Sequence, residues 1–123
     1  MKNDLKIVST ADGSNTIWNE HVGEHYHSKH GALQESKHVF LGSGLQYFLD
    51  KSGKEEVSVL EVGFGTGLNF LLTADFCIQS KISLNYVGIE AYPLSKDVLI
   101  DTEYKKFVNE PLWNSFMDNY QSS

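Results

Sequence analysis

The sequence contains few cysteines, few prolines and no long apolar run, and each shortage excludes a class of protein. Its 123 residues include one cysteine and two prolines. The single cysteine, Cys77, cannot form an intrachain disulfide. No run approaches the roughly 18 apolar residues that a membrane helix requires, and the charged N-terminus is not followed by a signal-peptide core. We therefore expect a cytoplasmic protein that has no membrane partner.

Basic residues are also scarce. Ten lysines and arginines stand against sixteen aspartates and glutamates, which gives a net charge of −6. Nonspecific binding of nucleic acid requires clustered lysine and arginine, so that function is excluded, whereas an enzyme with an RNA-binding surface elsewhere is not. The composition, 41% apolar and 21% charged, is ordinary for a globular protein, and the length allows at most one domain.

The first half of the chain predicts a hairpin followed by short helices. Leu5 to Thr10 alternates apolar and polar residues, and a turn sequence separates it from the β-prone run Thr16 to Trp18. The polar stretch from Glu20 to His30 reads as a loop. Helical spacing then begins at Ala32 and is interrupted at Gly42-Ser43-Gly44, which favours two short helices over one.

The second half predicts a strand, a helix and a second strand. Val57 to Val62 is a buried-type strand, Leu68 to Phe76 is an amphipathic helix, and Ile82 to Glu90 is the second apolar strand. We expect helix again from Leu94 to Phe116, interrupted at Pro111. This order gives a right-handed βαβ unit with two parallel strands, hence an α/β fold.

Two parallel strands are only part of a sheet, because parallel strands are normally covered on both faces and flanked by neighbours. A doubly wound domain would continue with further repeats after Ser123. We therefore expect a truncated form, the N-terminal part of a longer protein. In this division residues 1–50 are an N-terminal cover and residues 57–123 are the start of a Rossmann-like core.

A glycine-rich loop joins the first strand of this unit to its helix, in LEVGFGTGLNFLLT. A phosphate loop for nucleoside triphosphates would need lysine and then serine or threonine after its last glycine, but Gly67 precedes Leu68 and Asn69. A dinucleotide loop spaces its glycines as G-x-G-x-x-G. The spacing of Gly63, Gly65 and Gly67 is tighter, which disfavours a dinucleotide. A tight turn without any ligand is the remaining structural alternative.

The G-x-G-x-G spacing, with Glu61 two residues before Gly63, closely resembles S-adenosylmethionine-dependent methyltransferases. Their donor carries no phosphate, so the backbone must pass directly beside it, and glycine leaves that space free. The helix start at Leu68 and Asn69 can offer N–H groups to the donor's carboxylate. Glu90, at the end of the second strand, is placed to accept hydrogen bonds from both ribose hydroxyls. Tyr92 either lies against the adenine or is an ordinary aromatic residue.

Five histidines lie between His21 and His38, which raises the question of a metal site. Structural zinc usually takes four ligands, mostly cysteines, and catalytic zinc takes three with supporting partners. The spacing of these histidines fits neither set. We therefore expect no metal and a polar loop that covers the ligand or packs on the domain.

A more specific family resemblance runs from about Ser9 to Leu94. It is carried by Asp12-Gly13-Ser14, Tyr26-His27-Ser28, Gly31-Ala32 with Glu35-Ser36, Val39-Phe40, the glycine loop, and Glu90 with Pro93. These residues resemble the tRNA wobble-uridine methyltransferases, the methylating half of the bifunctional enzyme that makes 5-methylaminomethyl-uridine. A general methyltransferase would match only the glycine loop and the acid.

The resemblance implies a class I methyltransferase fold, S-adenosyl-L-methionine as cofactor and tRNA as partner. The implied reaction moves a methyl group to the primary amine of 5-aminomethyl-uridine at the wobble position. In the family the residues beside that amine lie after the fourth strand, beyond Ser123, so the isolated chain is expected to be inactive. By position Tyr26 and Glu35 would cover the donor. The alternatives are that Glu35 pairs with His38 and that Tyr26 packs on the hairpin.

Two other functions stay open at this point. The chain could be a non-catalytic relative that binds a partner or forms a homodimer through its exposed sheet edge. It could also be a methyltransferase of the same fold that acts on a small molecule. The N-terminal match favours the tRNA methyltransferase over both.

Overall fold

The computed structural model describes residues 5–120, which begin with a small antiparallel sheet. Its strands lie in the order β1 (Leu5–Ser9), β2 (Asn15–Asn19) and β3 (Glu24–His25). The hairpin of β1 and β2 confirms the prediction made from apolar alternation. The segment predicted as a loop contributes the short strand β3, which pairs with the end of β2.

The turn of this hairpin is tied to the helix that follows it. One carboxylate oxygen of Asp12 accepts hydrogen bonds from Thr10 Oγ1 (2.8 Å) and from the backbone N–H of Ser14 (3.0 Å). The other accepts from the backbone N–H of Gln34 at 2.8 Å. Burial by itself would raise the pKa of Asp12, but these hydrogen bonds, including one from the Ser14 hydroxyl, lower it to about 2.

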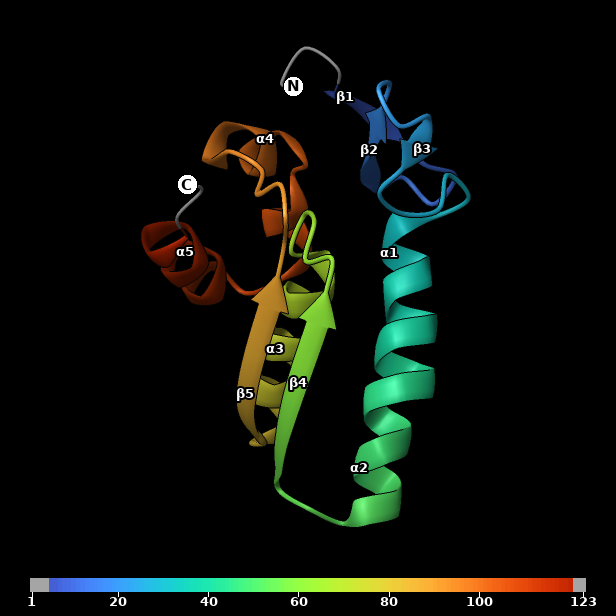
Figure 1. The fold of residues 1–123 in the computed structure, drawn as a ribbon. Helices are drawn as coiled ribbons and strands as arrows, with labels where there is room; N and C mark the ends of the chain where they lie inside the picture. The colour runs from blue at the N-terminus through green and yellow to red at the C-terminus, as the bar shows by residue number, and fades with distance from the viewer. Residues whose placement is uncertain (1–4, 121–123) are drawn as a thin grey trace.

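One continuous helical stretch replaces the two short helices that the sequence predicted. It comprises α1 (Ala32–Glu35), a run of wider turns from Ser36 to Gln46, and α2 (Tyr47–Ser52), drawn in Figure 1 as a single long helix. The predicted break at Gly42-Ser43-Gly44 is wrong. A glycine inside a helix costs about 1 kcal/mol relative to alanine, which weakens a helix without ending it. The stretch ends instead at Gly53, whose φ of 65° is left-handed.

The predicted βαβ unit is confirmed. It consists of β4 (Glu56–Val62), α3 (Leu68–Ser80) and β5 (Ser83–Ile89). The two strands are parallel, with Leu60 opposite Val87, and α3 crosses between them. Figure 1 shows both arrows pointing the same way, with α3 along one face of the pair. The carboxyl ends of the two strands therefore meet at one edge, beside the start of α3.

The C-terminal part is helical in three short segments. These are α4 (Lys96–Asp101), a 3₁₀ turn at Tyr104–Phe107, and α5 (Glu110–Asn119). The prediction that Pro111 interrupts a helix is wrong, since proline is tolerated in the first turn, where its missing N–H has no intrahelical acceptor. Asn109 caps α5 by accepting a 2.7 Å hydrogen bond from the N–H of Leu112. Within residues 5–120 no helix combines the length and apolar character of a bilayer-crossing segment.

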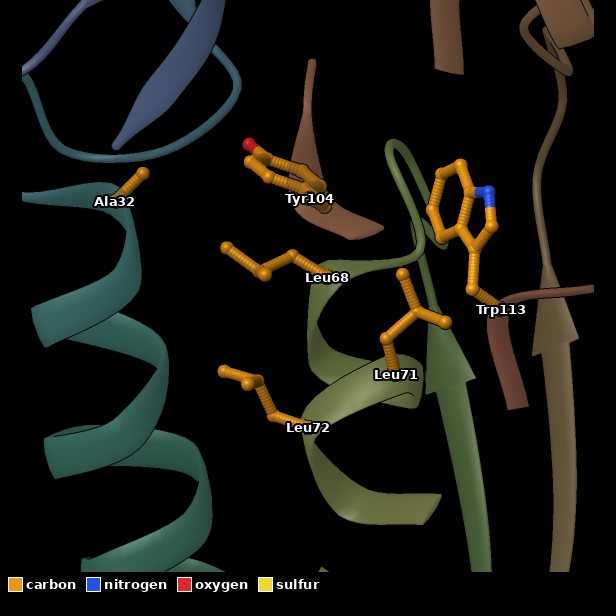
Figure 2. Packing of buried hydrophobic residues seen from close by; sticks show 6 residues of the cluster. All are labelled: Ala32, Leu68, Leu71, Leu72, Tyr104 and Trp113. Atoms are coloured by element: carbon orange, nitrogen blue, oxygen red, sulfur yellow. The ribbon is translucent and has the colours of Figure 1, made fainter. Parts of the chain in front are cut away.

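A buried cluster joins the long helix, α3 and the C-terminal segments. It consists of Ala32, Leu68, Leu71, Leu72, Tyr104 and Trp113. Figure 2 shows Leu68 and Leu72 pointing from α3 toward the long helix, and Trp113 beside Leu71. Both Leu68 and Tyr104 are completely buried. This packing fixes the first turn of α3, and with it the end of the glycine loop, in the centre of the molecule.

The face of the sheet opposite α3 is exposed. Leu60 and Val62 of β4 are 65% and 78% exposed, and Val87 and Ile89 of β5 are each 52% exposed. In β4 the alternation places Val57 and Glu61 on the buried side. The carboxyl-end half of this sheet face is thus apolar and uncovered within the described residues.

Candidate functional site

The glycine loop connects β4 to α3 through residues in left-handed backbone conformations. The φ angles of Gly63 and Gly65 are 84° and 57°, values that an L side chain rarely adopts. A Cβ at Gly63 would meet no heavy atom within 4 Å, whereas one at Gly65 would lie 3.1 Å from the ring of Tyr26. Open space therefore faces the loop at Gly63, and the N-terminal cover closes over it at Gly65.

Glu90 lies beside this loop, as the sequence predicted. One of its carboxylate oxygens accepts a 2.8 Å hydrogen bond from the N–H of Gly65, and the other accepts a 3.1 Å bond from the N–H of Tyr92. A carboxylate can accept about four hydrogen bonds, so two acceptor positions remain. The end of β5 is thus bonded to the loop and still presents a negative charge at the edge of the sheet.

Glu61 and Asn69 lie beneath the loop, on the α3 side of the sheet. Glu61 is 9% exposed and accepts hydrogen bonds from Tyr86 Oη (2.6 Å) and Asn69 Nδ2 (2.8 Å). Burial and the neighbouring Glu61 raise the pKa of Tyr86 far above its usual range, so this hydroxyl stays protonated and donates. The buried side chain of Glu61 in β4 is therefore hydrogen-bonded both to β5, through Tyr86, and to α3, through Asn69. Leu68 is also turned into the core, which leaves only its backbone to face the loop.

The remaining predicted residues belong to the cover and to the far rim. The ring of Tyr26 packs on Gly65, and burial together with Glu90 raises the pKa of this tyrosine. Glu35 pairs with His27, at 3.4 Å from Nδ1; the alternative pairing with His38 is therefore wrong. Tyr92 is 75% exposed, and only its N–H contacts Glu90. In the described part of the chain, its ring is exposed rather than packed against the site.

An aromatic cavity of about 460 Å³ adjoins Glu90, and the sequence analysis missed its far wall. That wall comes from α5 and the residue after it: Phe116 lies 6.3 Å from Phe64 of the glycine loop, and Tyr120 lies 5.5 Å from Phe116, between ring centres. The hydroxyl of Tyr120 donates to the backbone oxygen of Leu94 at 2.5 Å, which fixes its ring. The spacing of the α5 aromatics, three and four residues apart from Trp113 onward, is the signal that could have identified this face.

The histidines do not assemble into a metal centre in the described part of the chain. Residues 5–120 contain no group of three or more histidine, cysteine, aspartate or glutamate side chains that could hold an ion. His27 is instead mostly buried, with 13% of its side chain exposed. Its ring lies between Glu35 and Thr66 of the glycine loop.

The sequence of this chain is similar to those of several known proteins. No family model matches the chain. It is 30% identical over 98% of its length to the tRNA 5-methylaminomethyl-2-thiouridine biosynthesis bifunctional protein MnmC of Leptospira borgpetersenii, and 28% identical over 94% to that of Campylobacter fetus. A 40% identity to the Polaromonas naphthalenivorans protein extends over 72% of the chain. The chain spans only 18%, 18% and 14% of these three relatives.

A solved structure also resembles this chain in its fold. The crystal structure of MNMC2 from Aquifex aeolicus superposes with a TM-score of 0.62 at 29% sequence identity. The match covers 74% of this chain and 30% of that one. The resemblance found in the sequence therefore extends to the fold.

Proposed function

We propose that this chain, a homologue of the bifunctional tRNA 5-methylaminomethyl-2-thiouridine biosynthesis proteins, forms the donor-binding part of an S-adenosylmethionine-dependent tRNA methyltransferase. The observation that carries this proposal is the contact between the glycine loop and Glu90, whose carboxylate accepts a hydrogen bond from the N–H of Gly65 at 2.8 Å. The relatives are named for tRNA modification, which favours a tRNA substrate over a small molecule. A tRNA substrate is consistent with the cytoplasmic location expected from the sequence.

The residues present fit the donor. Open space faces the loop at Gly63, and a side chain there would fill it. Glu90 keeps free acceptor positions for two ribose hydroxyls. The 13-residue helix α3 begins immediately after the loop, and the N–H groups of its first turn have no intrahelical acceptors. The aromatic cavity beside Glu90 suits a flat base.

When bound, the donor supplies an electrophilic methyl group on a sulfonium. This chain's residues would hold and orient it: Glu90 at the ribose, the loop backbone beside the methionine part, and Tyr26 as part of the cover. Glu61 and Asn69 act from beneath by fixing the loop to the sheet. The amine acceptor must lose its proton before it attacks, and none of the residues named above is assigned that role. We therefore propose donor binding as the function of these residues.

Calorimetric titration with S-adenosylmethionine tests donor binding, using Glu90→Ala and a matched control, Glu56→Ala. Glu56 is an exposed carboxylate at the opposite end of the same sheet. A hydrogen bond to a charged group contributes about 1.5–3 kcal/mol, so Glu90→Ala should weaken binding about tenfold or more while Glu56→Ala does not. Equal affinities in the two variants would contradict the proposal.

A second assay tests for methyl transfer. The chain is incubated with labelled donor and tRNA that carries 5-aminomethyl-uridine. Turnover that is lost in Glu90→Ala would support donor binding at this site, and equal turnover in the wild type and Glu90→Ala would contradict it.

The exposed sheet face supports a proposal about oligomeric state. The outer edge of β4 adjoins a groove of about 420 Å³ lined by Val39, Phe40 and Phe48 of the long helix. Unpaired strand edges pair readily with other strands, so we propose a homodimer formed through β4. Sedimentation equilibrium of the wild type and Leu60→Lys tests it. A concentration-dependent dimer lost in the variant is expected, and a monomer at all concentrations would refute it.

A further inference from the structure

His27 connects three parts of the molecule that the donor site depends on. It follows β3 in the N-terminal cover, and its backbone N–H donates to Thr16 Oγ1 of β2 at 2.8 Å. Its Nδ1 lies 3.4 Å from Glu35 Oε1 at the start of the long helix. Its Nε2 lies 3.3 Å from Thr66 Oγ1 in the glycine loop. His27 thus bonds to the cover through its backbone, and its imidazole contacts both the long helix and the loop.

These partners assign the protons of the ring. The carboxylate of Glu35 can only accept, so Nδ1 must carry the hydrogen and donate to it. In the neutral ring Nε2 is then an acceptor, and the Thr66 hydroxyl donates to it. The Thr66 oxygen in turn accepts from the N–H of Leu68 at 3.4 Å. Neutral His27 therefore satisfies both partners, whereas a protonated ring would force the buried Thr66 hydroxyl to turn its proton elsewhere.

The contact of His27 with the loop is adjacent to a second contact between the same two segments. Tyr26 precedes His27, and Gly65 precedes Thr66. The ring of Tyr26 lies 3.1 Å from the position of a Cβ on Gly65. Tyr26 is also held by its N–H, which donates to the backbone oxygen of Ile17 at 2.9 Å. The two contacts with the loop are formed by consecutive residues on both sides, so they belong to one interface.

We propose that His27 is a positioning residue: its neutral ring fastens residues 24–30 to the glycine loop and holds Tyr26 on Gly65, and protonation of the ring loosens this fastening and weakens donor binding. The effect on donor binding rests on the function proposed above. The fastening, which is the contact of residues 24–30 with the glycine loop through His27, does not depend on that function, and NMR measures it without donor.

Burial of the ring, opposed by the charges around it, sets the direction of the pH effect. Burial lowers the pKa of His27, while Glu35 from the long helix and Glu61 from β4 act in the opposite direction and do not overcome it. Tyr104 also faces Thr66, and burial raises its pKa to about 12, so it stays neutral. Since an unfolded histidine titrates near pH 6.5, the fastening is intact above about that pH and weakens as pH falls toward the lower folded pKa.

The first experiment follows the fastening by NMR, without any donor. In the wild type, the His27 ring should titrate below the usual range of a histidine, and the amide signals of Gly65 and Thr66 should shift with the same midpoint. His27→Gln should remove this titration from the two loop amides. The control His30→Gln removes an exposed histidine of the same cover and should preserve it. Because the N–H of Gly65 also donates to Glu90, only the step that shares the His27 midpoint is diagnostic. Survival of that step in His27→Gln would overturn the proposal.

The second experiment measures the affinity for S-adenosylmethionine between about pH 7.5 and about pH 4.5. We expect the wild type to lose about fivefold or more in affinity over this range, and His27→Gln to lose less than about half as much, because the variant lacks the ring whose protonation disturbs the contact with Thr66. An identical pH dependence in both proteins would refute the link to donor binding. Absence of donor binding at every pH, together with the His27-dependent loop titration, would refute the proposed function while supporting the fastening.

Discussion

Gly63→Ala should weaken donor binding, and Gly13→Ala provides the control for its structural cost. The φ angles are 84° at Gly63 and 87° at Gly13, and a Cβ at either position would meet no heavy atom within 4 Å. An L residue held in the left-handed region costs roughly 1–2 kcal/mol. Both variants should therefore lose about the same free energy of unfolding, which urea denaturation measures.

The two variants should differ only in donor affinity. The methyl group on residue 63 enters the space assigned to the donor, whereas residue 13 lies in the hairpin turn of the N-terminal sheet. We expect Gly63→Ala to weaken binding of S-adenosylmethionine by at least about tenfold, or about 1.4 kcal/mol, in calorimetry. Gly13→Ala should bind as the wild type does. Equal losses of affinity in both variants would show that backbone strain, and not occupied space, weakens binding. Unchanged affinity in both variants would show that the donor does not bind beside Gly63.

Three further predictions concern stability. Leu68→Ala should destabilise by about 2–5 kcal/mol in urea denaturation because Leu68 is completely buried. Ile78→Ala, at a position of the same helix that is 57% exposed, should cost under about 1 kcal/mol, and similar losses would contradict the assigned core. Tyr86→Phe removes a donor to the buried Glu61 and should cost about 1–3 kcal/mol by the same assay, and a neutral result would show that Glu61 needs no partner there. The pKa of Asp12 is about 2 in the folded protein, so its contribution to the free energy of unfolding should be present above about pH 4 and lost as pH falls to about 2. This loss in acid should be smaller in Asp12→Asn, and an unchanged dependence of stability on pH would contradict it.

The βαβ unit and its loop could be read from the sequence because their signals are local. A buried strand, three alternating glycines and an amphipathic helix follow one another directly, so the parallel pair and the approach of Glu90 to the loop follow from chain order. The hairpin was equally local. In these segments propensity, pattern and packing agree.

Other features depended on packing between distant segments, which the pattern does not show. The continuous helix through Gly42 and Gly44 is held along α3, with Leu41 contacting two core clusters, and this outweighs the glycine penalty. The pairing of His27 with Glu35 crosses from the cover to the helix. The aromatic wall from α5 reaches the loop only because the chain folds back past β5. These contacts join residues far apart in sequence.

The central claim is that a methyl donor binds at the loop from Gly63 to Gly67 beside Glu90. The most direct measurement is a set of backbone amide spectra recorded while S-adenosylmethionine is added to the isotope-labelled chain. The account predicts saturable shifts at Gly63, Gly65 and Glu90, with none at Gly13 or Gly53, which have the same backbone conformation far from the site. A folded protein whose loop amides do not move, or move no more than those two glycines, would contradict it.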